Sequence, residues 1–178
     1  MSTNQINVNQ LEAIKELETS LNIEILGTDR ILIDICGQIQ NLTLGGCKVK
    51  NNHLKLISSL TSLKYLDLSK NQITEIKDLE NLKSLEWLYL SNNLITEIKG
   101  LDSFKYLWCL DLCNNLITKI TNLENVDFLE NIELVGNLIT EIKDLENLKS
   151  LRRLKWLNLE SNPIINKKHK KQSYGIHI

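Results

Sequence analysis

The stretch between residues 63 and 148 contains four near-copies of one 22-residue segment, which begin at Leu63, Leu85, Leu107 and Leu129. A segment this short cannot bury its apolar side chains alone, whereas stacked copies share one continuous core. A fixed period in this size range therefore predicts a solenoid, in which each copy forms one turn of the stack. No other feature of the sequence constrains the fold as strongly.

The start of each copy has the alternation of a short β-strand. In the first copy, Leu66 and Leu68 alternate with Tyr65, Asp67 and Ser69. A period of two places one set of side chains inward and the other outward. We expect neighbouring copies to pair these strands into a parallel sheet, with strands about 4.8 Å apart. The outward side chains would then stack in columns, with one residue from each copy.

An asparagine follows each strand at a fixed place, and a cysteine replaces it in the first turn. These ladder residues are Cys47, Asn71, Asn93, Asn115, Asn137 and Asn162. An asparagine side chain carries both donors and an acceptor, so we expect it to bond the backbone of its own turn and of the neighbouring turn. The pattern LxxLxLxxNxI, with Asn or Cys at this place, is typical of leucine-rich repeats. We therefore interpret Cys47 as structural rather than reactive.

The second half of each copy has apolar residues at spacings of three, namely Ile73, Ile76, Leu79 and Leu82 in the first copy. This spacing favours a tight helical or 3₁₀-like return path, with the charged residues between them in solvent. The predicted fold class is α/β. It is a leucine-rich-repeat solenoid with a curved parallel sheet on the concave face and short 3₁₀ or helical segments on the convex face.

The N-terminal part predicts a helical cap on the first repeat. Asn9 and Glu12 have the spacing of a capping box, and an apolar stripe follows at Leu11, Ile14, Leu17 and Leu21. Next, Ile31, Ile33 and Ile35 alternate with their neighbours and predict a strand. The expected organisation is a flexible N-terminus (1–8), a helix and capping strand (9–38), five to six repeats (39–164) and a basic tail (165–178).

The copies, above all LKYLDLSKNQITEIKDLENLKS, resemble the repeats of the regulatory subunit of protein phosphatase 1, a type shared by internalins and an axonemal dynein light chain. The later segment LENLKSLRRLKWLNLESNP contains a three-residue insertion. That segment is similar to the last repeat of acidic leucine-rich nuclear phosphoproteins and of the spliceosomal leucine-rich A-prime protein. Residues 162–169 are similar to the stretch that opens the C-terminal cap of the A-prime protein. Because the C-terminal cap of that family does not follow, we expect the last repeat to be poorly covered and able to associate with a neighbour.

Composition and motif content bear on the location of the protein and on its possible activities. A net charge of −1 gives no general attraction to nucleic acid. The polar start, the absence of a long apolar run and four cysteines without a paired framework predict an intracellular protein, cytoplasmic or nuclear, with no membrane contact. No nucleophile motif, phosphate-binding glycine loop or metal-ligand cluster appears, so we predict no enzyme activity, metal or cofactor. The tail could touch phosphate weakly through Lys167, Lys168, Lys170 and Lys171.

The outward columns of the sheet hold the candidate binding residues. The predicted partner-binding residues are Tyr65, Asp67, Trp87, Tyr89, Asp111, Glu133, Trp156 and Glu160. Grouped exposed aromatics are typical of protein-binding hot spots, and acids among them favour a partner with a basic or apolar segment. The alternative is that these side chains only cover the sheet. Trp108, one position before the outward columns, is interpreted as packing.

The sequence thus favours a non-enzymatic protein–protein interaction module, acting as an adaptor, scaffold or regulatory subunit. The alternative is a structural subunit of a ribonucleoprotein or of another large assembly, which the A-prime resemblance and the lysine tail suggest.

Overall fold

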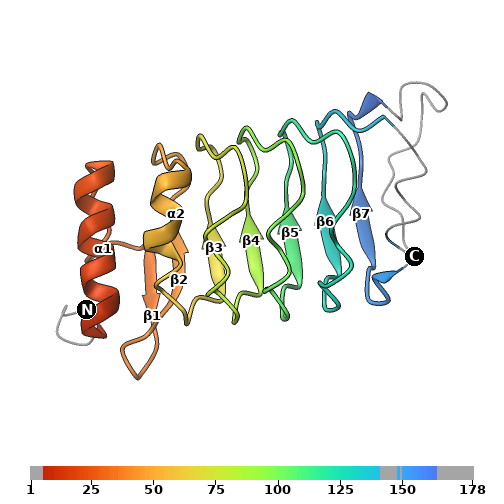
Figure 1. Ribbon diagram of the computed structural model, residues 1–178. Helices are drawn as coiled ribbons and strands as arrows, with labels where there is room; N and C mark the ends of the chain where they lie inside the picture. Colours follow the sequence, from red (N-terminus) through yellow and green to blue (C-terminus); the bar gives the residue numbers. More distant parts are fainter. Residues whose placement is uncertain (1–5, 141–147, 149, 164–178) are drawn as a thin grey trace.

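The computed structural model describes residues 6–140, 148 and 150–163. Figure 1 shows a row of strands side by side, with helix α1 at the N-terminal end of the row. The elements are α1 (Val8–Leu21), β1 (Ile31–Ile33), β2 (Ile39–Thr43), α2 (Asn51–Ile57), β3 (Tyr65–Asp67), β4 (Trp87–Tyr89), β5 (Cys109–Asp111), β6 (Asn131–Glu133) and β7 (Trp156–Asn158). The strands form one sheet in sequence order.

The strands from β2 to β7 are parallel, and each pair is in register from repeat to repeat. The central residue of every strand from β3 to β7 is buried between two half-buried neighbours. This is the pattern of a sheet with one face on the core and one face outward. The predicted leucine-rich-repeat solenoid with a parallel sheet is therefore confirmed.

The return paths pack their apolar residues into the same core. Ile73, Ile76, Leu79 and Leu82 are all buried, as are their counterparts in the next copy. Tight turns carry this path, with bonds such as Leu82 N–H to Leu79 O at 3.0 Å. Such i to i−3 bonds are the 3₁₀ type expected from the spacing. Only the repeat after β2 has a longer helix here, α2, within the described residues.

Helix α1 covers the first repeat. Ile14 and Leu17 on its inner face are fully buried, while its exposed side meets solvent. The expected capping box at Asn9 is wrong, because the helix begins at Val8 and its N-cap is Asn7. The Asn7 side chain accepts the Asn9 N–H at 3.1 Å, which satisfies one of the free amides of the first turn.

The residues just before α1 are anchored rather than free. Ile6 is buried, and Asn7 donates its N–H to Gly37 O at 2.9 Å. The packed chain therefore starts at least two residues before the boundary expected at residue 9. Residues 1–5 of the segment expected to be flexible lie outside the described residues.

Strand β1 pairs with β2 in antiparallel fashion, so the first edge of the sheet is a hairpin. The expected continuation of the strand to Ile35 is wrong, because β1 ends at Ile33 and Ile35 is fully exposed. Asp34 turns the chain instead, since its Oδ1 accepts the N–H groups of Cys36 and Gln38, both at 2.9 Å. Gly37, with φ of +74°, completes this turn.

Each repeat contributes one large apolar residue to a column in the return path, and the column varies in size. Leu82, Phe104 and Val126 occupy equivalent places, 22 residues apart, and each is at most 1% exposed. Phe104 has the largest fully buried side chain among the described residues. Side chains of different size thus occupy equivalent buried places in neighbouring repeats.

Two expectations concern residues that the structure does not describe. The lysines of the tail and the cover of the last repeat's outer edge both depend on residues 164–178. They remain predictions.

Candidate partner-binding face

A ladder of buried asparagines fixes the turns that follow the strands. Asn93 donates from Nδ2 to Leu90 O in its own turn and to Leu68 O in the previous turn, both at 3.0 Å. Its Oδ1 accepts the Ile73 N–H at 3.0 Å. The same arrangement recurs at the other ladder asparagines, which are Asn71, Asn115, Asn137 and Asn162. Each ladder amide therefore links two neighbouring repeats.

Cys47 occupies the first place of this ladder with a different set of contacts. It is 5% exposed, and its thiol lies 3.6 Å from Gly45 O. The Arg30 guanidinium donates to the Cys47 sulfur and to Thr43 O, both at 3.2 Å. No earlier parallel repeat precedes β2 among the described elements, and Arg30 instead ties this turn to the segment before β1.

The sheet register brings the predicted binding residues into two adjacent columns. Tyr65, Trp87, Cys109, Asn131 and Trp156 are direct partners along one column. Asp67, Tyr89, Asp111, Glu133 and Asn158 form the next. Glu160 lies two residues beyond Asn158. All eight predicted residues are half-buried, and together they are called the concave face below.

Three of the four aromatic rings of the concave face lie on β3 and β4, and Trp156 lies on β7. The ring centroids of Tyr65 and Tyr89 are 5.2 Å apart, and those of Trp87 and Trp108 are 6.1 Å apart in an edge-to-face arrangement. Both distances lie within the range of favourable aromatic contacts. The interpretation of Trp108 as a packing residue is incomplete, because Trp108 is 41% exposed and extends the aromatic surface. Its pairing partner lies one repeat earlier, so local alternation gave no signal for it.

The acidic side chains of the concave face lie among and beyond these rings. They are Asp67, Asp111, Glu133 and Glu160. Asp67 and Asp111 each accept a backbone N–H two residues on, at 2.8 and 2.9 Å. Glu133 accepts the Trp156 indole N–H at 2.6 Å. Each of these three carboxylates is thus oriented by hydrogen bonding and keeps further acceptor capacity.

None of the ion pairs among the described residues includes a carboxylate of the concave face. At the strand entrances, by contrast, Lys64 pairs with Glu86 and Lys155 pairs with Glu130. The face therefore carries four negative charges that no described lysine or arginine neutralises. Such a surface attracts cationic groups of a partner.

A second exposed cluster lies outside the predicted columns. Tyr106 and Phe128 have ring centroids 5.8 Å apart, and the Arg153 guanidinium lies 4.0 Å from the Phe128 centroid. Each of the three residues directly precedes the first leucine of its repeat. They were missed because strand alternation does not extend to this position. Reading the same place in successive copies would have found them.

Burial strongly perturbs two groups on or beside this face. It raises the pKa of the Tyr89 phenol to about 12. It also raises the pKa of the Cys113 thiol to about 12, with a hydrogen bond to Asp111 and the Asp111 charge adding to the rise. Both groups are therefore neutral at physiological pH. All four cysteines are free thiols.

The raised pKa of Cys113 predicts that the cysteine thiols react at different rates. With iodoacetamide at pH 8, we expect exposed Cys36 to be alkylated much faster than Cys113. Only about one Cys113 side chain in 10⁴ is a thiolate at that pH, and the thiolate is the reactive form. Mass spectrometry of timed samples measures the order, and the denatured chain is the control, in which the difference should vanish. Equal native rates would contradict the burial of Cys113.

Neither helix in the part of the chain that the structure describes is long and apolar enough to cross a membrane. No group of three or more His, Cys, Asp or Glu side chains in that part could hold a metal ion.

The stacked strands, the asparagine ladder and the outward columns define a leucine-rich-repeat solenoid. The sequence profile of a family described as leucine-rich repeat region matches residues 31–174, and the chain belongs to this family. Proteins of this family are generally non-enzymatic interaction modules. No curated protein matches the chain.

Several solved structures are similar to this chain. Internalin C2 of Listeria monocytogenes is 32% identical, with a TM-score of 0.61, over 74% of this chain and 58% of that chain. A second internalin of that organism, inlF, is 29% identical, with a TM-score of 0.63, over 90% of this chain and 48% of that chain. The chain thus spans about half the length of these internalins. The matches do not distinguish the phosphatase-regulatory and A-prime classes that the sequence resembles.

The ectodomain of the Arabidopsis thaliana receptor kinase HAESA shares the fold, with 21% identity and a TM-score of 0.71, over 90% of this chain and 30% of that chain. That ectodomain was crystallised in complex with an extended IDA peptide hormone. At this identity the likeness concerns the fold alone.

Proposed function

We propose that this chain is a non-enzymatic adaptor, scaffold or regulatory subunit that binds a cationic segment of a partner protein on its concave face. One observation carries the proposal: four carboxylates without ion-pair partners among the described residues share this face with half-buried aromatic rings. Lysine and arginine suit both features, because they pair with carboxylates and bind aromatic faces. Solenoids of this kind commonly use the concave surface for binding.

The spacing of the acids suggests the pattern of the partner segment. Asp67 and Asp111 lie two strands apart in the same column, so their backbones are about 10 Å apart. An extended peptide rises about 3.3 Å per residue. A peptide crossing the strands would therefore place basic residues three apart opposite these two carboxylates, with Tyr89 beneath the residues between them.

A fluorescently labelled peptide with arginines three residues apart, flanked by apolar residues, tests this proposal by anisotropy. Charge reversal at Asp67 and Asp111 is not a clean test, because it would remove the hydrogen bonds to the Ser69 and Cys113 N–H groups as well as the charge. Substitution by asparagine keeps a side-chain oxygen as acceptor and removes only the charge. We expect the double variant Asp67→Asn/Asp111→Asn to bind roughly tenfold or more weakly, which corresponds to about 1.4 kcal/mol, and Trp87→Ala to lose at least as much.

The matched control is Asp78→Asn/Asp127→Asn, which removes two charges from exposed return-path positions. It should bind as the wild type does. Equal weakening by both double variants would show a general charge effect, and no weakening by either concave-face variant would reject this face as the binding site. Raising the salt concentration should weaken wild-type binding.

The ribonucleoprotein alternative depends on the A-prime resemblance and on a lysine tail outside the described residues. The unneutralised acids of the concave face would repel phosphate, so RNA contact would fall to the tail. Co-purified RNA that is lost at moderate salt would support this alternative.

A further inference from the structure

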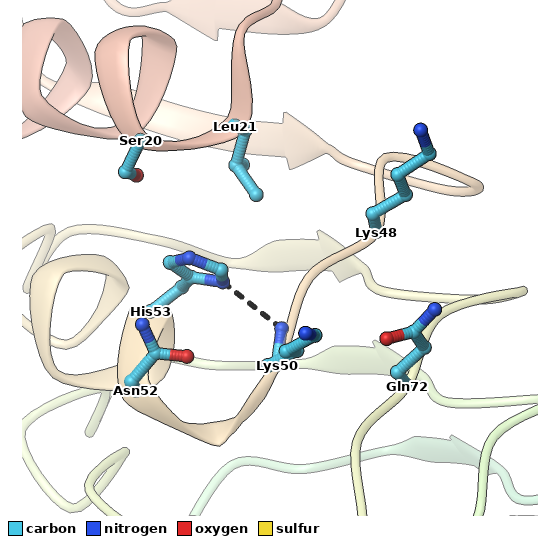
Figure 2. A pocket seen from close by; sticks show the side chains of 7 residues that line it. All are labelled: Ser20, Leu21, Lys48, Lys50, Asn52, His53 and Gln72. Carbon is cyan, nitrogen blue, oxygen red and sulfur yellow. Dashed lines mark hydrogen bonds between the residues drawn. The ribbon is translucent and has the colours of Figure 1, made fainter.

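A polar pocket lies between the end of α1 and the connection from β2 to α2, apart from the concave face. Its volume is about 350 Å³. The lining residues, shown in Figure 2, are Ser20, Leu21, Lys48, Lys50, Asn52, His53 and Gln72. They come from α1, the β2–α2 connection, α2 and the turn after β3. This site is called the cap pocket below.

The cap pocket is rich in cationic and hydrogen-bond-donating groups. Lys48 and Lys50 are exposed, and neither forms an ion pair with any described residue. No aspartate or glutamate lines the pocket. The remaining polar groups are a hydroxyl and two amides. The pocket thus carries two uncompensated positive charges and several neutral donors.

His53 gives the pocket a fixed donor. The residue is only 8% exposed, and its Nδ1 accepts the Lys50 backbone N–H at 2.9 Å, the bond drawn in Figure 2. A neutral imidazole that accepts at Nδ1 carries its proton on Nε2. That Nε2–H group forms no hydrogen bond with any described residue, and it is not sealed from solvent. This N–H group is therefore available to a ligand that accepts a hydrogen bond.

Burial lowers the pKa of His53, and the positive charge of Lys50 lowers it further. The imidazole is therefore neutral at pH 7, as the donor assignment requires.

We propose that the cap pocket binds a phosphate group, either as inorganic phosphate or as part of a small phosphate monoester. His53 Nε2–H and the ammonium groups of Lys48 and Lys50 are its principal ligands. A phosphate offers several acceptor oxygens and up to two negative charges, which match an N–H donor and two lysines that line one pocket. An apolar ligand would leave the His53 donor unpaired. The site is independent of the concave face and of the function proposed for it.

The test is a titration of the full chain with sodium phosphate at constant ionic strength, followed by NMR of the His53 ring and of the amides of residues 48–53. We expect saturable shifts in the wild type. Lys50→Met should weaken binding about tenfold, and His53→Glu should abolish it. Glutamate can still accept the Lys50 N–H in the manner of a capping box, so this variant should fold normally, which thermal unfolding checks.

Lys119→Met is the matched control. Lys119 lines a different pocket together with Glu97, and its loss should leave phosphate binding unchanged. Phosphoserine as free amino acid, titrated alongside inorganic phosphate, assigns the source: tighter binding of the ester identifies a monoester, and equal or weaker binding identifies inorganic phosphate. Linear, unsaturable shifts, or equal affinity in His53→Glu and the wild type, would overturn the proposal.

Discussion

Replacing Asn115 by alanine is expected to lower the free energy of unfolding by about 4 kcal/mol. The Asn115 amide donates to Leu90 O, Leu112 O and Cys113 O at 3.0, 3.0 and 3.2 Å, and its Oδ1 accepts the Ile95 N–H at 3.0 Å. Asn115 is 4% exposed, so the truncated site leaves these backbone groups without partners in the core. Each unsatisfied buried group costs roughly 1–3 kcal/mol, reduced where water enters. Chemical denaturation measures the loss.

Asn125→Ala is the control for this variant. The Asn125 amide bonds the Asp102 carboxylate at 2.7 Å on the exposed surface, where water can replace the bond, so its removal should change stability by no more than about 0.5 kcal/mol. A loss below about 1 kcal/mol for Asn115→Ala would mean that the ladder amides are not what holds neighbouring repeats together.

Replacing Phe104 by alanine is expected to lower the free energy of unfolding by about 3–5 kcal/mol. The ring is fully buried, and the return path around it is held by bonds such as Leu107 N–H to Phe104 O at 3.2 Å. The backbone cannot collapse freely into the cavity, so both apolar contact and packing are lost. Phe104→Leu should lose less, because leucine occupies this place in the preceding copy. Thermal and chemical denaturation measure the series.

Tyr106→Ala provides the comparison. It removes an aromatic ring two residues away that is 58% exposed, and it should lower stability by about 1 kcal/mol or less. Similar losses at Phe104 and Tyr106 would contradict the burial of the Phe104 column.

The sequence predicts the solenoid because the same pattern occurs in each of the four copies. Four copies repeat the same alternation, so strand, ladder and return path follow from one reading, and Leu66, Asn93 and Ile73 lie where that reading puts them. The two columns of the concave face follow as well, because the parallel strands keep one register. That this face binds a partner stays a prediction.

What the sequence did not predict depends on contacts between residues in non-equivalent positions. Trp87 meets Trp108 across a repeat boundary and one position out of column. Arg30 reaches the Cys47 thiol from outside the parallel repeats. The helix begins at Val8, so its N-cap is Asn7 and not Asn9, although Asn9 has the spacing of a capping box. A repeat pattern predicts only contacts between equivalent positions of successive copies. Contacts between non-equivalent positions are seen only in the structure.

The asparagine ladder also determines where the chain tolerates changes in length. Asn137 and Asn162 are 25 residues apart instead of 22, yet Asn162 Oδ1 still accepts the Ile139 N–H at 3.0 Å. The additional residues fall in the return path, while β6 and β7 stay in register. Insertions between ladder positions therefore leave the columns of the concave face aligned. In such a solenoid, the return paths and the outward strand residues can change independently, because the strands and the ladder asparagines keep the register between them.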